Sequence, residues 1–193
     1  MNHLAHALLG GPDENVVLGS LMGDFVRGAV DTDLPPGVRA GIVLHRAIDS
    51  FTDAHARIVA TRGLFEPPFR RYAGILIDIW FDHLLARDFS RWSDSPLETF
   101  SDGIVATLER HEPLLPVDLR RFTRYLRANG LPANYRHREA IAQALAGVGT
   151  RLSRPNPLAR GLDAIAVVEP QLQAAFDAFF PQLVEHARVL RSG

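Results

Sequence analysis

Carboxylates and imidazoles interrupt three apolar, helix-like stretches within the first 83 residues of the chain. The segment YAGILIDIWFDHLL, residues 72–85, is apolar nearly all round and yet contains Asp78, Asp82 and His83. An unpaired carboxylate in such surroundings is strongly unfavourable, so each acid needs a compensating partner. For Asp78 that partner is either a bound metal ion or an arginine such as Arg46, and the sequence leaves both interpretations open.

A second pair lies in GIVLHRAIDSFTD, residues 41–53, where His45 and Asp49 are four residues apart. In a helix this spacing places an imidazole and a carboxylate on one face. Taken alone, the pair is typical of a core histidine that an aspartate orients. In SLMGDFV, residues 20–26, Asp24 follows small residues that permit either close helix packing or room for a ligand.

Three neighbouring helices that each bury an acid form the pattern with which helical bundles build carboxylate metal sites. The chain has no cysteine, and all 21 of its basic residues are arginine. Thiolate sites, disulfides, cysteine nucleophiles and lysine Schiff bases are therefore excluded. A metal would be held by histidine and carboxylate, which suits Mn, Mg, Fe or Zn. No GxSxG, Walker A, HExxH or dinucleotide motif indicates a rival chemistry.

The spacing of apolar residues is helical along nearly the whole chain. With 193 residues, 47% apolar and 22% charged, the sequence predicts an all-α fold, a single-domain bundle of about eight helices over residues 1–193. Pro170 and Pro181 are expected to break the last helix into two or three pieces. Helix starts are expected near Asn15 and Ser95 as caps, and near Pro35, Asp53, Phe69, Pro116, Asn134 and Asn156.

Charge and hydropathy limit the surroundings in which the chain can act. The net charge of −1 argues against nucleic-acid binding, and no run of about 18 apolar residues predicts a membrane span. The first residues, MNHLAHALLGG, lack the basic residues of a secretory signal. We therefore expect a cytoplasmic protein that binds neither nucleic acid nor membrane.

Five stretches of the chain carry a family signature: MNHLAH, GDFVRG, GIVLHRAIDSFTD, RRYAGILIDIWFDHLLAR and NYRHREAI. In these the sequence closely resembles the acyl carrier protein phosphodiesterase (acyl carrier protein hydrolase) family, a divergent branch of the HD-type metal hydrolases. The resemblance implies an HD-like fold and a divalent metal, most typically Mn²⁺, with Mg²⁺ or Fe²⁺ also suitable. It further implies hydrolysis of the 4′-phosphopantetheine–serine phosphodiester of holo-acyl carrier protein.

Transferred position by position, the resemblance implies metal ligands at Asp24, His45, Asp49, Asp78, Asp82 and His83. It also implies catalytic roles for His6, His45, Asp49, Arg27 and Arg46. Arginines would stabilise charge on the phosphoryl oxygens, and a histidine would protonate the leaving serine oxygen. Ser20 stands where relatives often have asparagine, which predicts an altered substrate preference if its side chain reaches the substrate.

A stripe of arginines suggests how an acidic carrier protein would dock. Arg120, Arg124 and Arg127 follow helical spacing on one face, and such a stripe attracts acidic partners over a distance. The simpler interpretation is a solvated helix face. Two other functions stay open at this point: an HD-like phosphohydrolase for a nucleotide or other small phosphodiester, and a non-enzymatic helical adaptor for acidic proteins. Reaction products and metal content separate the three.

Overall fold

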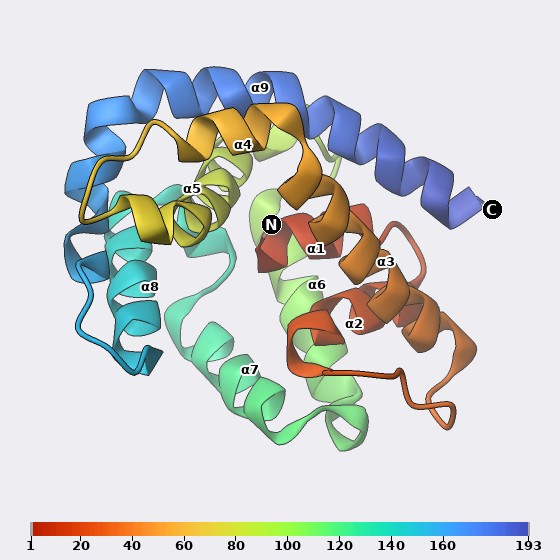
Figure 1. The fold of residues 1–193 in the computed structure, drawn as a ribbon. Coiled ribbons are helices and arrows are strands. Elements are labelled where there is room, and N and C mark those ends of the chain that lie inside the picture. Colours follow the sequence, from red (N-terminus) through yellow and green to blue (C-terminus); the bar gives the residue numbers. More distant parts are fainter. Residues whose placement is uncertain (1, 193) are drawn as a thin grey trace.

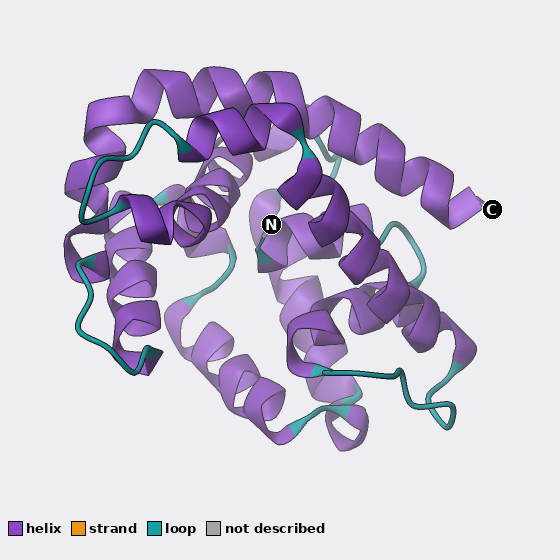
Figure 2. Ribbon diagram, viewed as in Figure 1, coloured by secondary structure: helices purple, strands orange, loops and turns teal. Residues whose placement is uncertain are grey.

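The computed structural model describes residues 2–192, and every regular element in that span is a helix (Figures 1 and 2). The described residues form nine α-helices: α1 (His3–Leu9), α2 (Glu14–Met22), α3 (Pro36–Ala54), α4 (Ala56–Arg62), α5 (Ala73–Arg87), α6 (Leu97–Arg110), α7 (Val117–Asn129), α8 (Arg138–Arg151) and α9 (Gly161–Ser192). The predicted all-α fold is confirmed. None of these helices is long and apolar enough to cross a membrane.

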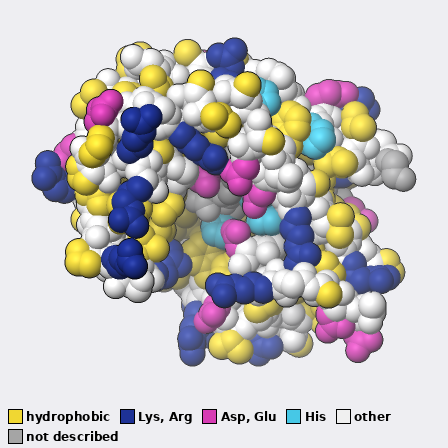
Figure 3. Space-filling model, viewed as in Figure 1, with side chains coloured by type: hydrophobic (Ala, Val, Ile, Leu, Met, Phe, Trp, Pro, Cys, Tyr) yellow, Lys and Arg dark blue, Asp and Glu magenta, His cyan; other side chains and the backbone are white. Residues whose placement is uncertain are grey.

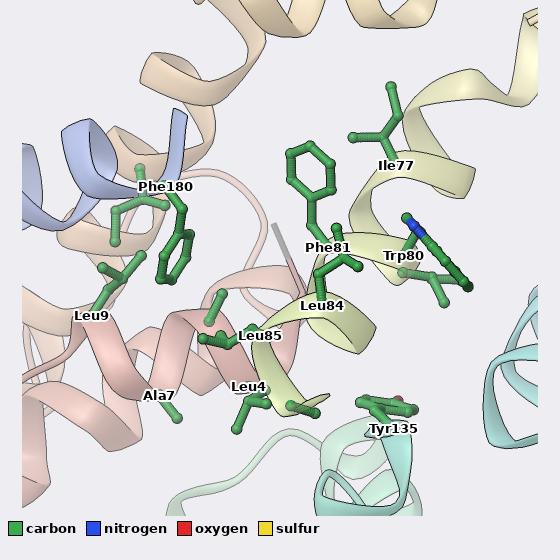
Figure 4. Close-up of a cluster of buried hydrophobic side chains, with 14 of the residues drawn as sticks. Leu4, Ala7, Leu9, Ile77, Trp80, Phe81, Leu84, Leu85, Tyr135 and Phe180 are labelled. Atoms are coloured by element: carbon green, nitrogen blue, oxygen red, sulfur yellow. The ribbon is translucent and has the colours of Figure 1, made fainter. Parts of the chain in front are cut away.

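Helix α5 lies at the centre of the hydrophobic core, as its apolar sequence predicts. Leu4 of α1 and Phe180 of α9 pack with Phe81 and Leu84 of α5, and all four side chains are fully buried (Figure 4). The 3₁₀ turn η5 (Ala133–Arg136) and helix α8 contact α5 as well. Because other elements surround α5, most of its surface is buried, and this explains why its sequence is apolar nearly all round.

Helices α2 and α3 pack with their backbones in contact, which two glycines make possible. A Cβ atom on Gly19 would lie 1.9 Å from the carbonyl oxygen of Val38, and one on Gly41 would lie 2.1 Å from that of Val16. Any larger residue at either position would force the helices apart. The small residues before Asp24 were expected to permit either close helix packing or room for a ligand, and for Gly19 the structure shows close packing.

Helix α9 contradicts the prediction that prolines divide the tail. It runs unbroken for 32 residues with Pro170 and Pro181 inside it, and it curves over one edge of the molecule (Figure 1). Both prolines are exposed, so water can satisfy the backbone carbonyls that lose an intrahelical donor. Burial of Phe176 and Phe179 on the opposite face offsets the lost hydrogen bonds. Tertiary packing therefore overrides the local effect of proline.

Two predicted helix caps are also wrong. Asp13, and not Asn15, caps α2, because its Oδ1 accepts hydrogen bonds from the backbone N–H groups of Asn15 (2.8 Å) and Val16 (3.3 Å). Helix α6 starts at Leu97 without any side-chain cap, so Ser95 does not have the predicted role. The turn η1 (Gly23–Phe25) follows α2 directly and carries Asp24.

Candidate metal centre

Helices α1 and α3 bring two histidines and an aspartate together. Nε2 of His6 lies 3.1 Å from Oδ1 of Asp49, and Nε2 of His45 lies 3.1 Å from Oδ2 of the same carboxylate. The two imidazole rings stack with their centroids 3.9 Å apart. One ligand atom from each of the three residues lies within 4.8 Å of the others, so they could share one metal ion. Figure 3 shows histidine and acidic side chains gathered in a hollow at the centre of the face in view.

The hydrogen bond of His45 to the backbone decides which of its nitrogens faces the carboxylates. Nδ1 lies 2.8 Å from the carbonyl oxygen of Ser20, which can only accept, so Nδ1 carries a proton. Nε2 then points between Asp49 and Oδ1 of Asp24, 3.4 Å away. Burial lowers the pKa of His45, but these two carboxylates outweigh burial and raise the pKa to about 9. The two carboxylates thus favour a positive charge at Nε2, which a proton supplies at neutral pH and a metal ion would supply in its place.

His6 and Asp49 are in the protonation states that metal ligands need. Burial lowers the pKa of His6 to about 4, so its imidazole is neutral at pH 7. Burial alone would raise the pKa of Asp49, but the hydrogen bonds with His45 and His6 hold it well below its usual range. At neutral pH the cluster therefore presents a neutral imidazole beside an ionised carboxylate.

Ser20 and Gly23 hold the two histidines in place. Ser20 is fully buried; its hydroxyl donates to the carbonyl oxygen of His6 (3.2 Å), while its own carbonyl oxygen accepts from His45. A Cβ atom on Gly23 would lie 2.1 Å from Cγ of His45, so only glycine leaves space for the ring. Since the Ser20 side chain points into the protein, the structure gives no support to direct contact between it and a substrate.

Asp24 and two arginines lie where the cluster meets solvent. The side chain of Asp24 is 50% exposed. Partial burial raises its pKa, but the interactions with His45, His3 and His6 together lower the pKa below its usual value. Arg46 of α3 donates from Nη2 to the carbonyl oxygen of Val26 (2.9 Å). This bond ties the turn that carries Asp24 and the exposed Arg27 to helix α3.

Asp82 and His83 lie outside the three-residue cluster and bond to the backbone. Asp82 is fully buried and accepts hydrogen bonds from the N–H groups of Leu4 (2.9 Å) and Ala5 (3.1 Å). It therefore caps α1 from a distant helix, and burial raises its pKa to about 7. His83 donates from Nδ1 to the carbonyl oxygen of Tyr135 (2.8 Å). Asp82 thereby positions α1, which carries His6, and His83 holds the turn η5 against α5.

Asp78 lies on the side of α5 that is electrostatically coupled to the cluster. Its side chain is half-buried, and burial raises its pKa. The negative charge of Asp49 raises the pKa further, as does that of Asp53. The charge of Asp49 thus affects the pKa of Asp78, although Asp78 is not one of the three residues that can share one ion.

Comparison with known proteins assigns the chain to a family. Residues 1–183 match the model of the acyl carrier protein phosphodiesterase family. The chain belongs to this family. A relative named acyl carrier protein phosphodiesterase from Serratia proteamaculans is 33% identical over 189 residues, which cover 97% of this chain and 98% of the relative. Relatives of the same name from Klebsiella pneumoniae subsp. pneumoniae and Escherichia coli O6:H1 are each 34% identical, over 97% of both chains.

The predicted membership of the acyl carrier protein phosphodiesterase family is thereby confirmed. None of the solved structures matches the fold significantly, so its description as HD-like stays a prediction. Three family motifs that are separated along the chain meet at the cluster. MNHLAH, GDFVRG and GIVLHRAIDSFTD together supply every residue of the cluster and its mouth.

His3 also belongs to this environment, although the spacing of acids and histidines did not predict it. His3 is half-buried, and burial lowers its pKa to about 4, against the opposing charge of Asp24. Its ring packs 4.5 Å from that of Phe122 on α7 and 6.3 Å from that of Phe25. The signal was present in the family motif MNHLAH, where His3 precedes His6 by three residues and therefore shares its helix face.

Proposed function

We propose that the chain is a metal-dependent phosphodiesterase that hydrolyses the 4′-phosphopantetheine–serine linkage of holo-acyl carrier protein. The products would be apo-acyl carrier protein and 4′-phosphopantetheine. The observation that carries this proposal is the cluster of His6, His45 and Asp49, built from family motifs in a chain that matches its relatives over nearly their full length. A helical adaptor would have no need for two buried imidazoles that converge on one carboxylate.

The residues that would hold a divalent cation are His6, His45 and Asp49, with Asp24 at the mouth. The orientation of Nε2 of His45 toward two carboxylates fits this use, because a divalent cation there would take the place of the proton that the carboxylates otherwise hold on Nε2. Two imidazole nitrogens with carboxylate oxygens suit Mn²⁺ and Fe²⁺, while Mg²⁺ would bind the oxygens. When bound, such a cation lowers the pKa of a coordinated water and polarises phosphoryl oxygens.

The remaining residues of the site orient groups and supply charge. Arg46 holds the turn with Asp24 through its bond to Val26, so we assign it a positioning role. Arg27 lies exposed on the same turn, and its guanidinium would add positive charge for the phosphodiester. His6 is neutral at pH 7, which suits a ligand better than a proton donor. Asp82 and His83 do not belong to the group of residues whose ligand atoms converge, so they are not in the ligand set that we propose.

The acidic carrier protein would approach the face that contains α7. Of the arginine stripe, Arg120 donates to the carbonyl oxygen of Leu115 (2.9 Å), and Arg127 forms an ion pair with Glu109. Arg124 is exposed. Arginine side chains surround the hollow in the view of Figure 3, so positive charge is not confined to the stripe. We therefore expect Arg124 to contribute most of the stripe's attraction for an acidic helix.

Mass spectrometry of the carrier protein tests the proposal directly. Purified protein is incubated with holo-acyl carrier protein and Mn²⁺, and the carrier is expected to lose the mass of phosphopantetheine. Asp49→Asn keeps the side-chain shape but removes the charge, so it is expected to abolish the loss. A carrier of unchanged mass would refute the proposal, and cleavage of a nucleotide or small phosphodiester in the same preparation would then favour the alternative hydrolase.

A further inference from the structure

A cavity of about 300 Å³ opens between α7 and α8, away from the metal cluster. This volume is at the lower end of those that hold small organic molecules. The residues that line it are Tyr125, Asn129, Leu131, Asn134, His137, Glu139, Ala140 and Gln143.

A continuous strip of aromatic rings joins this cavity to the metal cluster. It begins with His3, which lies on α1 one helical turn before His6. The ring of His3 packs 4.5 Å from that of Phe122, and the ring of Phe122 stacks 6.1 Å from that of Tyr125. Tyr125 is 41% exposed and lines the cavity. Since His3 and Phe122 are only half-buried, the strip is accessible from solvent along its length.

The polar lining of the cavity combines three side-chain amides with the Tyr125 hydroxyl, the His137 imidazole and the Glu139 carboxylate. The Nδ2 group of Asn129 donates to the carbonyl oxygen of Tyr125 (2.8 Å), and that of Asn134 donates to the carbonyl oxygen of Asn129 (2.7 Å). These bonds fix both side chains and leave their Oδ1 atoms as acceptors. Gln143 is exposed and offers both a donor and an acceptor. The three amides suit a ligand that has amide groups of its own, and the Glu139 carboxylate disfavours a negative charge on the part of the ligand that enters the cavity.

We propose that the aromatic strip and this cavity bind the pantetheine arm of the substrate. The inference rests on the proposed function and adds the direction of the arm, from the phosphate at the metal cluster, past His3 and Phe122, to the cavity beside Tyr125. Pantetheine is uncharged, and it contains two amides, a dimethyl-substituted carbon and a terminal thiol. The aromatic rings cover its apolar segments, and the side-chain amides bind its own amides. The cavity thereby selects a phosphodiester that carries this arm.

Two surface substitutions test the site with little risk to folding, because Tyr125 and Gln143 are both exposed. Gln143→Trp fills the cavity, and Tyr125→Ala removes part of its wall. The matched control is Ala128→Trp, an exposed position on α7 that does not line the cavity. The dissociation constant of 4′-phosphopantetheine is measured by calorimetry, and the rate with holo-acyl carrier protein is compared with that for bis(p-nitrophenyl) phosphate, which has no arm.

We expect Gln143→Trp and Tyr125→Ala each to raise the dissociation constant of 4′-phosphopantetheine about tenfold, and Ala128→Trp to leave it unchanged. The ratio of carrier-protein to small-diester activity falls by a similar factor. If the parent cleaves holo-acyl carrier protein and the Gln143→Trp variant binds 4′-phosphopantetheine as the parent does, the arm site is refuted while the function stands. If the parent does not cleave the carrier, the function fails, and the calorimetry still decides whether the cavity binds the arm.

Discussion

Gly23 gives the strictest test of how the cluster is built, because its replacement by alanine affects one ring and little else. Its backbone is right-handed helical, with φ −52° and ψ −43°, so alanine fits the local conformation. In open space that change would stabilise a helix by about 0.5–1 kcal/mol. Here the new Cβ atom would lie 2.1 Å from Cγ and 2.3 Å from Cδ2 of His45, whereas ordinary contact begins at 3.4 Å. The imidazole therefore has to move by more than an ångström.

A shift of that size separates His45 from the groups that orient it. The hydrogen bond from Nδ1 to Ser20 is 2.8 Å and the contact of Nε2 with Asp49 is 3.1 Å, and neither survives such a displacement. Loss of an orienting contact lowers metal affinity about 10–100-fold. A catalytic group displaced by an ångström lowers turnover about 100-fold. We expect both losses in Gly23→Ala.

Gly103→Ala on α6 is the matched control, because nothing lies within 4 Å of its added Cβ atom. We expect it to bind Mn²⁺ like the parent and to unfold with the same or a slightly higher free energy. Calorimetric titration with Mn²⁺, thermal unfolding and carrier-protein mass would be recorded for the parent and both variants. A Gly23→Ala protein with the affinity and turnover of the parent would refute the placement of His45 as a metal ligand.

Three further predictions concern the metal, the cap of α1 and the docking face. Mn²⁺ is expected to raise the melting temperature of the parent protein but not that of the Asp49→Asn variant. A chelator is expected to abolish activity while the protein stays folded, and activity in the metal-free protein would contradict the metal requirement. Burial raises the pKa of Asp82 from its ordinary 3.8 to about 7. Between these two pH values the folded state binds one proton more than the unfolded state. The free energy of unfolding therefore falls as pH rises through this range, on the order of 1 kcal/mol per pH unit. Urea titrations of Asp82→Asn at pH 4.5 and 7.5 should lack this slope while Mn²⁺ affinity persists; a parental slope would disprove the assignment. Arg124→Ala is expected to raise KM for carrier protein with kcat unchanged, more at low salt than at high salt, and an unchanged KM at low salt would make this arginine part of a solvated face.

Several features of the molecule follow from the sequence without reference to tertiary structure. Helical spacing and the absence of strand patterns predicted the all-α fold, and the fully apolar segment around Phe81 predicted that α5 would be buried. His45 and Asp49 were paired by their spacing of four, and the structure places them on one face. The absence of cysteine restricts ligands to histidine and carboxylate, and the family motifs predicted the membership that the comparisons confirm. These are local or compositional properties, which the chain carries before it folds.

Only the tertiary structure decided which of the buried acids meet. His6 reaches Asp49 from 43 residues away because Gly19 and Gly41 let α2 approach α3 and Ser20 ties α1 to both. The family resemblance implies a metal ligand at Asp82, and the structure adds that its carboxylate accepts hydrogen bonds from two N–H groups at the start of α1. A buried carboxylate is stabilised by whichever donor packing brings near it, and a single sequence does not contain that information.

The same reason explains helix α9. Proline disrupts a helix locally, but whether the helix breaks depends on which face of it the core covers. Pro170 and Pro181 face solvent while apolar residues on the opposite side pack into the core, so the helix continues. The sequence determined the residue types available for a helix and for a metal centre, and long-range packing determined which of them act together, because burial and hydrogen bonding depend on the neighbours that folding supplies.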